Sequence, residues 1–256
     1  MDLDRYLALA TDLADAAGAA IRPHFRQNLA VDDKPDLSPV TIADREAEAA
    51  MRRLIAARFP DHGIIGEEFG REQEDAEFVW VLDPIDGTKS FISGVPLFGT
   101  LIALARRGRP ILGIIDQPIS RERWIGAAGR PTLFNGAPIR CRPCPSLAGA
   151  TLFATSPDMF AGDDRAAFAR VAAATKLARF GADCYAYGLL AHGFIDLVVE
   201  SGLKPYDFSA ILPVVEGAGG FASDWRGANL TVASDGRVVV AGDRRTYEAA
   251  LALLAV

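Results

Sequence analysis

The stretch from residue 78 to residue 88 constrains the fold of this chain more than any other, because it joins a buried strand to a pair of acids. Residues 78–82, FVWVL, form an apolar run with the length and composition of a core strand. Asp83 and Pro84 follow, and Pro84, which lacks an N–H group, predicts the end of the strand's hydrogen-bonded ladder. Asp86 comes next, so two carboxylates three residues apart stand at the end of a core strand.

Two carboxylates held this close by a stiff turn repel each other unless a cation lies between them. Hard divalent cations bind carboxylate and carbonyl oxygens, and the turn offers these ligands with neither thiol nor imidazole. Asp-Pro and Asp-Gly are also ordinary turn dipeptides, so the motif alone has a second interpretation as a solvated surface turn. The choice between the two depends on acids elsewhere in the chain.

Two further acidic segments accompany this turn. Upstream, Glu67 and Glu68 follow the apolar pair 64–65. Downstream, the sequence KPYDFSA places Asp207 at the start of a helix-like run that ends in the glycine-rich sequence EGAGG at 216–220. An acid at a helix start is well placed with respect to the helix dipole.

The segments GEE, WVLDPIDGTKSF and YDFSA…EGAGG, in this order, resemble the metal-site pattern of the inositol monophosphatase family, and the resemblance covers nearly the whole chain. It implies an α/β (α+β) fold, a layered αβαβα sandwich of the inositol monophosphatase or sugar phosphatase type. It further implies a phosphatase that uses two to three Mg²⁺ ions and acts on a small phosphate monoester. A homodimer is expected on the same ground.

The resemblance also implies which residues hold the metals, with Asp83 as the bridge between two ions. The implied metal ligands are Glu67, Asp83, the backbone carbonyl of Ile85, Asp86 and Asp207. Phosphate monoesters hydrolyse extremely slowly without a catalyst, and Mg²⁺ neutralises the dianion and activates a bound water. Because we find no Cys or Ser nucleophile motif, we expect direct attack by water.

Three residues have expected roles around that water and the phosphate. Thr88 and Glu67 are the pair expected to orient the attacking water. The backbone N–H groups of Gly87 and Thr88 are available to hold phosphate oxygens, as in other glycine turns. We interpret the neighbouring Glu68 as a solvated loop acid.

Asp44 has two interpretations that the sequence leaves open. Residues 31–40, which include Lys34 and Pro35, read as a loop, and Thr41 then caps a helix that extends to about residue 59. Asp44 stands at position N3 of this helix, where it would complete a capping box. The loop and helix also resemble the family's K…SPVT..AD motif, which implies that this acid lies near a third metal.

The second half of the chain indicates the substrate. The segments DCY, which begins at Asp183, and ESGLKPYD, which begins at Glu200, resemble the histidinol-phosphate phosphatase branch of the family. That branch converts L-histidinol phosphate to L-histidinol in histidine biosynthesis. The substrate carries an ammonium and a titratable imidazole, which Asp183 and Glu200 could meet, with Asp207 beside the phosphate. Asp183 could instead only cap a helix at 184–192, and Lys204 could pair with Glu200 or Asp207.

Other functions remain as alternatives. A broad inositol- or sugar-phosphate phosphatase would use the same metal site, and a phosphatase of phosphoadenosine phosphates would need a second basic pocket. A non-catalytic regulator could keep the fold, but it has no need for mutually repelling acids. Relative rates on two esters would separate the first alternative from the leading hypothesis.

The composition restricts the partners. The 256 residues carry a net charge of −6 with a pI near 5.2 and no run of Lys or Arg, which argues against a nucleic-acid partner. The N-terminus does not read as a secretory signal and no apolar stretch is long enough to span a bilayer, so we expect a cytoplasmic enzyme. The three cysteines are odd in number and are interpreted as structural thiols.

We expect two domains, an N-terminal one at 1–148 with most metal ligands and a C-terminal one at 149–256 with Asp207 and the specificity residues. The boundary follows from the Pro-, Gly- and Cys-rich composition of residues 129–149. Besides the elements above, the first half predicts a helix at 3–26, a hairpin of strands 100–105 and 111–115, and a strand at 124–128. The second half predicts helices at 163–175, 184–192, 207–217 and from 244, with strands at 151–154, 177–180, 195–200, 220–223 and 238–241.

Overall fold

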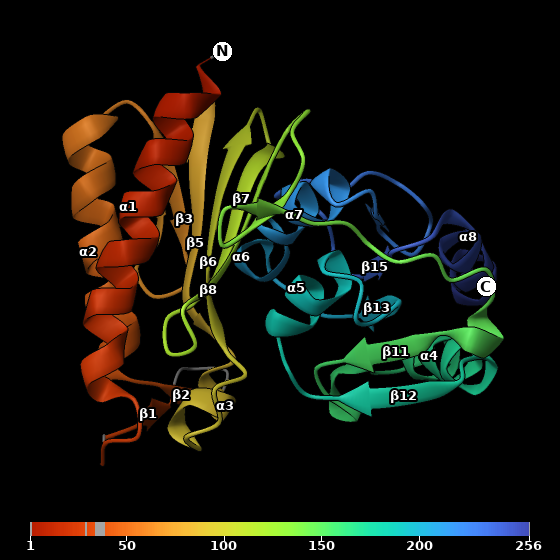
Figure 1. Ribbon diagram of the computed structural model, residues 1–256. Helices are drawn as coiled ribbons and strands as arrows, with labels where there is room; N and C mark the ends of the chain where they lie inside the picture. Colours follow the sequence, from red (N-terminus) through yellow and green to blue (C-terminus); the bar gives the residue numbers. More distant parts are fainter. Residues whose placement is uncertain (1, 29, 34–38, 256) are drawn as a thin grey trace.

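A computed structural model describes residues 2–28, 30–33 and 39–255, so Lys34 and Pro35 of the predicted loop lie outside the described residues. The described chain forms five layers, helix, sheet, helix, sheet, helix, as Figure 1 shows from one edge. This confirms the predicted αβαβα sandwich. No helix in the described parts of the chain is long and apolar enough to cross a membrane.

The helices form the first, third and fifth layers. The first layer contains α1 (Leu3–Ile21) and α2 (Ile42–Arg58). The middle layer contains α5 (Tyr185–Ala191), α6 (Pro205–Phe208) and α7 (Ile211–Gly217). The last layer contains α4 (Asp163–Ala174) and α8 (Arg244–Leu254). The predicted helix at 3–26 ends earlier, and a 3₁₀ turn at Arg22–His24 follows it.

The first sheet has eight strands in the order β10-β9-β8-β7-β6-β5-β3-β4, in which β3 and β5 are parallel and the other pairs are antiparallel. The predicted hairpin is present as β6 and β7. The strands are β3 (Gly63–Gly66), β4 (Gly70–Glu72), β5 (Phe78–Asp86), β6 (Gly99–Arg106), β7 (Arg109–Gln117), β8 (Glu122–Ala127), β9 (Leu133–Phe134) and β10 (Ala137–Pro138).

The second sheet has five strands in the order β12-β11-β13-β15-β14, and β11 is parallel to both of its neighbours. Its strands closely match the predicted ones. They are β11 (Thr151–Ala154), β12 (Leu177–Phe180), β13 (Leu197–Glu200), β14 (Phe221–Ser223) and β15 (Val238–Ala241). The remaining short elements are β1 (Asp32–Asp33), β2 (Pro39–Val40), α3 (Thr88–Ile92) and 3₁₀ turns at Leu147–Gly149 and Pro157–Met159.

Alternation along β5 explains why its apolar run has no polar face. Trp80 and Leu82 lie in a core cluster with α1 and α2, whereas Val79 and Val81 lie in the cluster formed with the middle helices. Successive side chains of a strand point to opposite faces, so a strand covered by helices on both sides must be apolar throughout. Val198 of β13 belongs to the same middle cluster, so both sheets share it, and the division at 148/149 remains a prediction.

Two predicted boundaries were wrong. Pro84 does not end the central strand, because β5 continues through Asp86 with an irregularity that accommodates the proline. The helix predicted at 207–217 is divided into α6 and α7, which are separated at residues 209–210.

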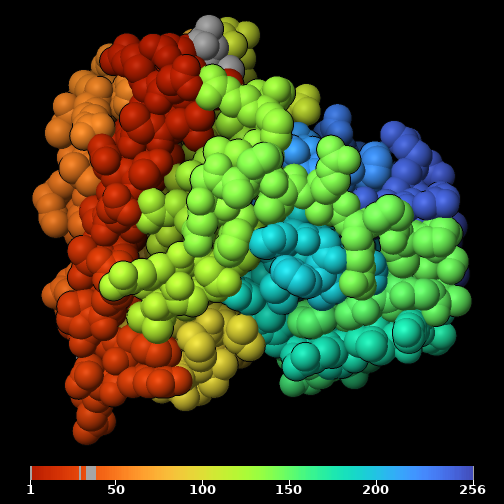
Figure 2. All heavy atoms as spheres, in the orientation of Figure 1, coloured from red at the N-terminus to blue at the C-terminus, as the bar shows by residue number. Residues whose placement is uncertain are grey.

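Figure 2 shows all heavy atoms as spheres in the same orientation, with the helices of the first layer at one side and the C-terminal elements at the other.

Candidate active site

The acidic turn is a β-bulge inside β5. Asp83 pairs with Leu101 of β6 and Asp86 pairs with Gly99, so three steps along β5 correspond to two steps along β6. The extra residue bends the strand and redirects its side chains. The hydroxyl of Thr100 donates a hydrogen bond of 2.8 Å to the carbonyl oxygen of Pro84, which satisfies an acceptor that the ladder leaves unpaired.

This bulge brings three carboxylates together. Asp83, Asp86 and Asp207 each offer an oxygen atom, and these atoms lie within 4.8 Å of one another. Burial raises the pKa of Asp83 well above its usual range, and the charges of its acidic neighbours raise it further. Burial raises the pKa of Asp86 in the same way. A cation at this place would reverse that effect, because it stabilises the ionised carboxylates.

Asp207 reaches the cluster from the middle layer. It is the third residue of α6, and its Oδ2 accepts a hydrogen bond of 2.7 Å from the backbone N–H of Lys204. Burial raises the pKa of Asp207 to about 7, although this hydrogen bond and the charge of Lys204 act in the opposite direction. The backbone of Lys204 therefore binds Asp207, and the charge of its side chain acts on this acid without an ion pair in the described chain.

Glu67 and Asp44 extend the acidic cluster toward α2. Glu67 follows β3, and its N–H donates to the carbonyl of Leu82 at 3.2 Å, next to Asp83. Asp44 completes the predicted capping box, since its Oδ2 accepts hydrogen bonds from the N–H and hydroxyl of Thr41. Its Oδ1 is buried without a hydrogen-bond partner in the described chain, and burial, with a smaller contribution from the charge of Glu67, raises the pKa of Asp44. The capping role is confirmed, and the second oxygen remains available for the metal role.

Gly87 and Thr88 form the turn after the bulge. Gly87 has a φ of +93°, and a Cβ atom at this position would lie 2.9 Å from Oδ2 of Asp183. Only glycine fits both the left-handed backbone and this close approach. The hydroxyl of Thr88 donates a hydrogen bond of 3.1 Å to the carbonyl oxygen of Ile85, which keeps a second lone pair for another ligand.

Asp183 lies beside this turn and does not cap a helix. Helix α5 begins two residues later, and no side chain makes a hydrogen bond at its N-terminus. The alternative in which Asp183 serves only as a helix cap was therefore wrong. Its Oδ2 accepts a hydrogen bond of 3.2 Å from the hydroxyl of Ser90, and burial together with the charge of Glu200 raises its pKa to about 6.

Glu200 ends β13 and is only 3% exposed. Its Oε1 accepts a hydrogen bond of 2.6 Å from the N–H of Thr155, and its Oε2 accepts one of 2.6 Å from the hydroxyl of Tyr187. Thr155 follows β11, the parallel neighbour of β13, so both residues stand at the same edge of the second sheet. Burial raises the pKa of Glu200.

A cavity of about 380 Å³ connects these groups. The predicted residues that line it are Glu67, Asp86, Gly87, Thr88, Asp183, Glu200 and Asp207. Sequence reasoning missed Thr155, Tyr187 and Tyr206, which also line it. Thr155 directly follows the predicted strand 151–154, and Glu200 ends the predicted strand 195–200. If these two strands had been expected to be parallel neighbours, their ends would have placed Thr155 beside Glu200.

A layered αβαβα sandwich whose central strand ends in a cluster of buried carboxylates defines a metal-dependent phosphatase. The sequence matches the Inositol monophosphatase family over residues 2–255, and the chain belongs to this family.

Three relatives illustrate the match. The chain is 53% identical over 259 residues to the bifunctional phosphatase IMPL2, chloroplastic, of Arabidopsis thaliana, covering 98% of this chain and 75% of that protein. It is 36% identical over 234 residues to a histidinol-phosphatase of Chlorobaculum parvum, covering 91% and 90% of the two chains. The structure of an inositol monophosphatase from Zymomonas mobilis superposes with a TM-score of 0.92 at 49% identity over 100% of both chains.

Proposed function

We propose that this protein hydrolyses L-histidinol phosphate to L-histidinol and phosphate with Mg²⁺. The observation that supports this substrate is the pair of buried acids, Asp183 and Glu200, in the cavity that also contains Asp86 and Asp207. An ammonium or imidazolium group would find opposite charge there, whereas an inositol ring offers only hydroxyls. The similarity to a histidinol-phosphatase over most of the chain supports the same proposal.

The residues present fit a hard divalent cation. Oδ1 of Asp83 is buried without a hydrogen-bond partner among the described residues, as expected of an oxygen that binds a metal. Glu67, Asp83, the carbonyl of Ile85, Asp86 and Asp207 would hold two Mg²⁺ ions, and Asp44 would lie near a third. When bound, these ions would neutralise the phosphate and lower the pKa of a coordinated water.

The chain itself orients the reactants. The hydroxyl of Thr88 donates its hydrogen bond to the carbonyl of Ile85, so its oxygen would accept a hydrogen bond from the attacking water. Glu67 would accept the other proton of that water. The N–H groups of Gly87 and Thr88 would bind two phosphate oxygens, which requires the close approach that only glycine allows at position 87.

Two acids would determine which ester binds. Asp183, with a pKa near 6, would be held ionised by a bound ammonium group. Glu200 accepts one hydrogen bond on each oxygen, from Thr155 and from Tyr187, and it lines the same cavity. We therefore propose Asp183 as the direct contact and Glu200 as a second negative charge.

The test compares phosphate release from L-histidinol phosphate and from myo-inositol 1-phosphate with Mg²⁺. We expect kcat/KM to favour histidinol phosphate about 100-fold, which is about 2.7 kcal/mol of transition-state preference. Asp183→Asn should lower this ratio at least about tenfold, since a charged hydrogen bond contributes about 1.5–3 kcal/mol. The matched control, Asp75→Asn, changes an exposed acid outside the cavity and should leave the ratio unaltered.

The second candidate is a broad inositol- or sugar-phosphate phosphatase. The Zymomonas mobilis inositol monophosphatase, at 49% identity over the whole chain, favours it. Comparable rates on the two esters would overturn the histidinol assignment and support this candidate. Release from neither ester would favour a non-catalytic binding protein.

We also propose a homodimer in the cytoplasm. A mass near twice the 27.3 kDa of one chain in light scattering would support the dimer, and a mass equal to one chain would exclude it under those conditions.

A further inference from the structure

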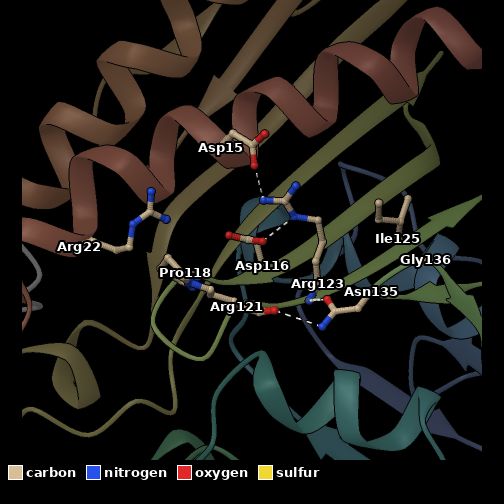
Figure 3. A pocket seen from close by; sticks show the side chains of 9 residues that line it. All are labelled: Asp15, Arg22, Asp116, Pro118, Arg121, Arg123, Ile125, Asn135 and Gly136. Atoms are coloured by element: carbon tan, nitrogen blue, oxygen red, sulfur yellow. Dashed lines mark hydrogen bonds and ion pairs between the residues drawn. The ribbon is translucent and has the colours of Figure 1, made fainter.

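A second pocket, of about 510 Å³, lies between α1 and the β7–β8 hairpin. None of the residues that line it lines the active-site cavity. In the space-filling view, the red surface of α1 adjoins yellow-green atoms of the segment that contains β7 and β8 (Figure 2). Three arginines lie around this pocket, Arg22, Arg121 and Arg123 (Figure 3).

Arg123 is held in place by two acids. Its Nε donates a hydrogen bond of 2.6 Å to Oδ1 of Asp116, which is only 4% exposed, and its Nη2 donates one of 2.8 Å to Oδ1 of Asp15. Both bonds are drawn in Figure 3. Its Nη1 has no hydrogen-bond partner within the described chain. The guanidinium is therefore fixed in orientation and still has N–H groups to donate.

Arg22 is directed to the pocket by a glycine. A Cβ atom on Gly18 would lie 2.7 Å from Nη1 of Arg22 and 3.3 Å from Cβ of Pro118. The Arg22 side chain therefore lies back along α1 over Gly18, close enough to Asp116 for its charge to offset part of the rise in the pKa of that acid that burial causes. In the part of the chain that the structure describes, no hydrogen bond or ion pair within 4.0 Å involves the Arg22 side chain.

Arg121 approaches from the turn between β7 and β8. Its backbone has a φ of +60°, and its carbonyl accepts a hydrogen bond of 3.1 Å from Nδ2 of Asn135, which fixes the turn. Its guanidinium makes no ion pair with a described residue. Two guanidinium groups in this pocket thus lack a hydrogen-bonded carboxylate, in a chain with 33 acids and only 27 Lys and Arg residues.

We infer that this pocket binds a phosphate group, either inorganic phosphate or the phosphoryl end of a small molecule. The guanidinium groups of Arg22 and Arg121 match the two negative charges of phosphate, and Nη1 of Arg123 adds a pre-oriented donor. Arginine is suited to this role because its planar fork binds phosphate oxygens in pairs. The buried Asp116 stabilises the charge of Arg123, so this guanidinium stays in place when the ligand leaves.

The test titrates inorganic phosphate into the full-length protein by calorimetry, with Mg²⁺ and again with EDTA. The acidic cluster of the active site repels phosphate when no cation is present, so phosphate binding in EDTA reports the arginine pocket. We expect one site in EDTA, with at least tenfold weaker binding in the double variant Arg22→Gln/Arg121→Gln. Arg53→Gln/Arg140→Gln is the matched control, because it removes two exposed arginines outside the pocket and should keep the affinity.

Two further measurements sharpen the outcome. The first is a titration in EDTA with ethylphosphonate, which is not hydrolysed. Binding of both ethylphosphonate and phosphate would indicate that the pocket accepts the phosphoryl end of a small molecule, and binding of phosphate alone would indicate a site for inorganic phosphate. The ratio kcat/KM of Arg22→Gln/Arg121→Gln should equal that of the wild type, which separates this site from the catalytic one. Absence of phosphate binding in EDTA, or equal affinity in this variant and the wild type, would overturn the inference.

Discussion

At the level of single residues, the molecule concentrates unfavourable charge at Asp83, Asp86 and Asp207. Burial raises the pKa of all three, and each is close enough to the others to raise it further or to share a ligand. Such a cluster destabilises the protein unless protons or cations neutralise it. The arrangement therefore favours a bound cation and lowers the stability of the folded protein when no cation is present.

Asp86→Asn tests this arrangement. We expect Mg²⁺-dependent phosphate release to fall about 100-fold or more, since charge stabilisation by a bound metal contributes several kcal/mol. The free energy of unfolding in EDTA should rise, by on the order of 1–2 kcal/mol at pH 8, because a buried charge is removed. Enzyme assays and urea denaturation measure the two effects, and Asp75→Asn serves as the exposed control.

The sequence predicted several residues that line the cavity, but not the contacts that hold them there. Gly87 was predictable, because a glycine after two acids indicates a turn with a close approach. The position of Asp183 was not, because it depends on a contact with Ser90, 93 residues away in the chain. The same applies to Glu200, whose partner Thr155 is 45 residues distant. Local patterns carry no information about such pairs.

At the level of elements, β6 supports the bulge of β5. Thr100 of β6 is fully buried and its hydroxyl bonds to Pro84, whose ring cannot take part in the ladder as a donor. This explains why Pro84, which predicts a strand end from sequence, is accommodated inside a strand here. The interruption of the predicted helix 207–217 also has a sequence signal, because Pro213 has no N–H to donate to the carbonyl of Ser209, four residues earlier, where α6 gives way to α7.

Thr100→Val should therefore affect both stability and activity. The valine has the same shape but leaves the Pro84 carbonyl unsatisfied, which costs about 1–3 kcal/mol of unfolding free energy. We expect kcat/KM to fall as well, because the bulge positions Asp83 and Asp86. Thr11→Val in α1, which removes a hydroxyl bonded to the carbonyl of Leu7, is the matched control and should leave kcat/KM unchanged. An unaltered kcat/KM in Thr100→Val would show that the bulge does not need this bond.

The approach of the middle helices to the first sheet depends on Gly113 of β7. A Cβ atom there would lie 1.9 Å from the carbonyl oxygen of Ala210, at the junction of α6 and α7. Gly113→Ala should lower the free energy of unfolding by about 1–3 kcal/mol, the usual cost of overpacking. Urea denaturation measures this, with Gly149→Ala as control, since a Cβ atom there meets only Oγ of Ser146 at 3.9 Å. Equal losses in the two variants would contradict the prediction.

At the level of the whole molecule, the site joins layers that the sequence presents separately. Asp83 and Asp86 come from the first sheet, Asp207 comes from the middle helices, and Glu200 comes from the second sheet. The five layers were predicted through the family resemblance. Hydrophobic patterns alone predicted the individual strands and helices, because these patterns are local, but they did not predict which strand ends meet.

The metal-free protein should become less stable as pH rises from about 4 to about 7. The pKa of Asp207 is about 7 and that of Asp183 about 6 in the folded protein, against an ordinary value of 3.8. In this range the folded protein holds protons that the unfolded chain has released, so stability falls by about 1.4 kcal/mol per pH unit for each proton held. Saturating Mg²⁺ should reduce this slope, because the cation replaces the protons.

Urea denaturation at pH 5, 6, 7 and 8, in EDTA and in Mg²⁺, measures this dependence. Asp207→Asn should show a shallower slope in EDTA, since one of the titrating groups is gone. If the free energy of unfolding in EDTA instead increases with pH over this range, the buried acids do not destabilise the metal-free protein and the prediction is wrong.

The bulge in β5 also makes the site depend on the number of residues between its two acids. In a regular strand, residues three positions apart point to opposite faces, and here the single extra residue brings Asp83 and Asp86 to the same group of oxygens. Loss of one residue between them would remove the bulge and leave the two acids two positions apart on one face of a regular strand, without the bend at which their oxygen atoms and an oxygen of Asp207 lie within 4.8 Å of one another. We therefore expect the site to depend more on the number of residues between the two acids than on the side chains at positions 84 and 85. The length of this segment thus contributes to the site alongside the identity of its two acids.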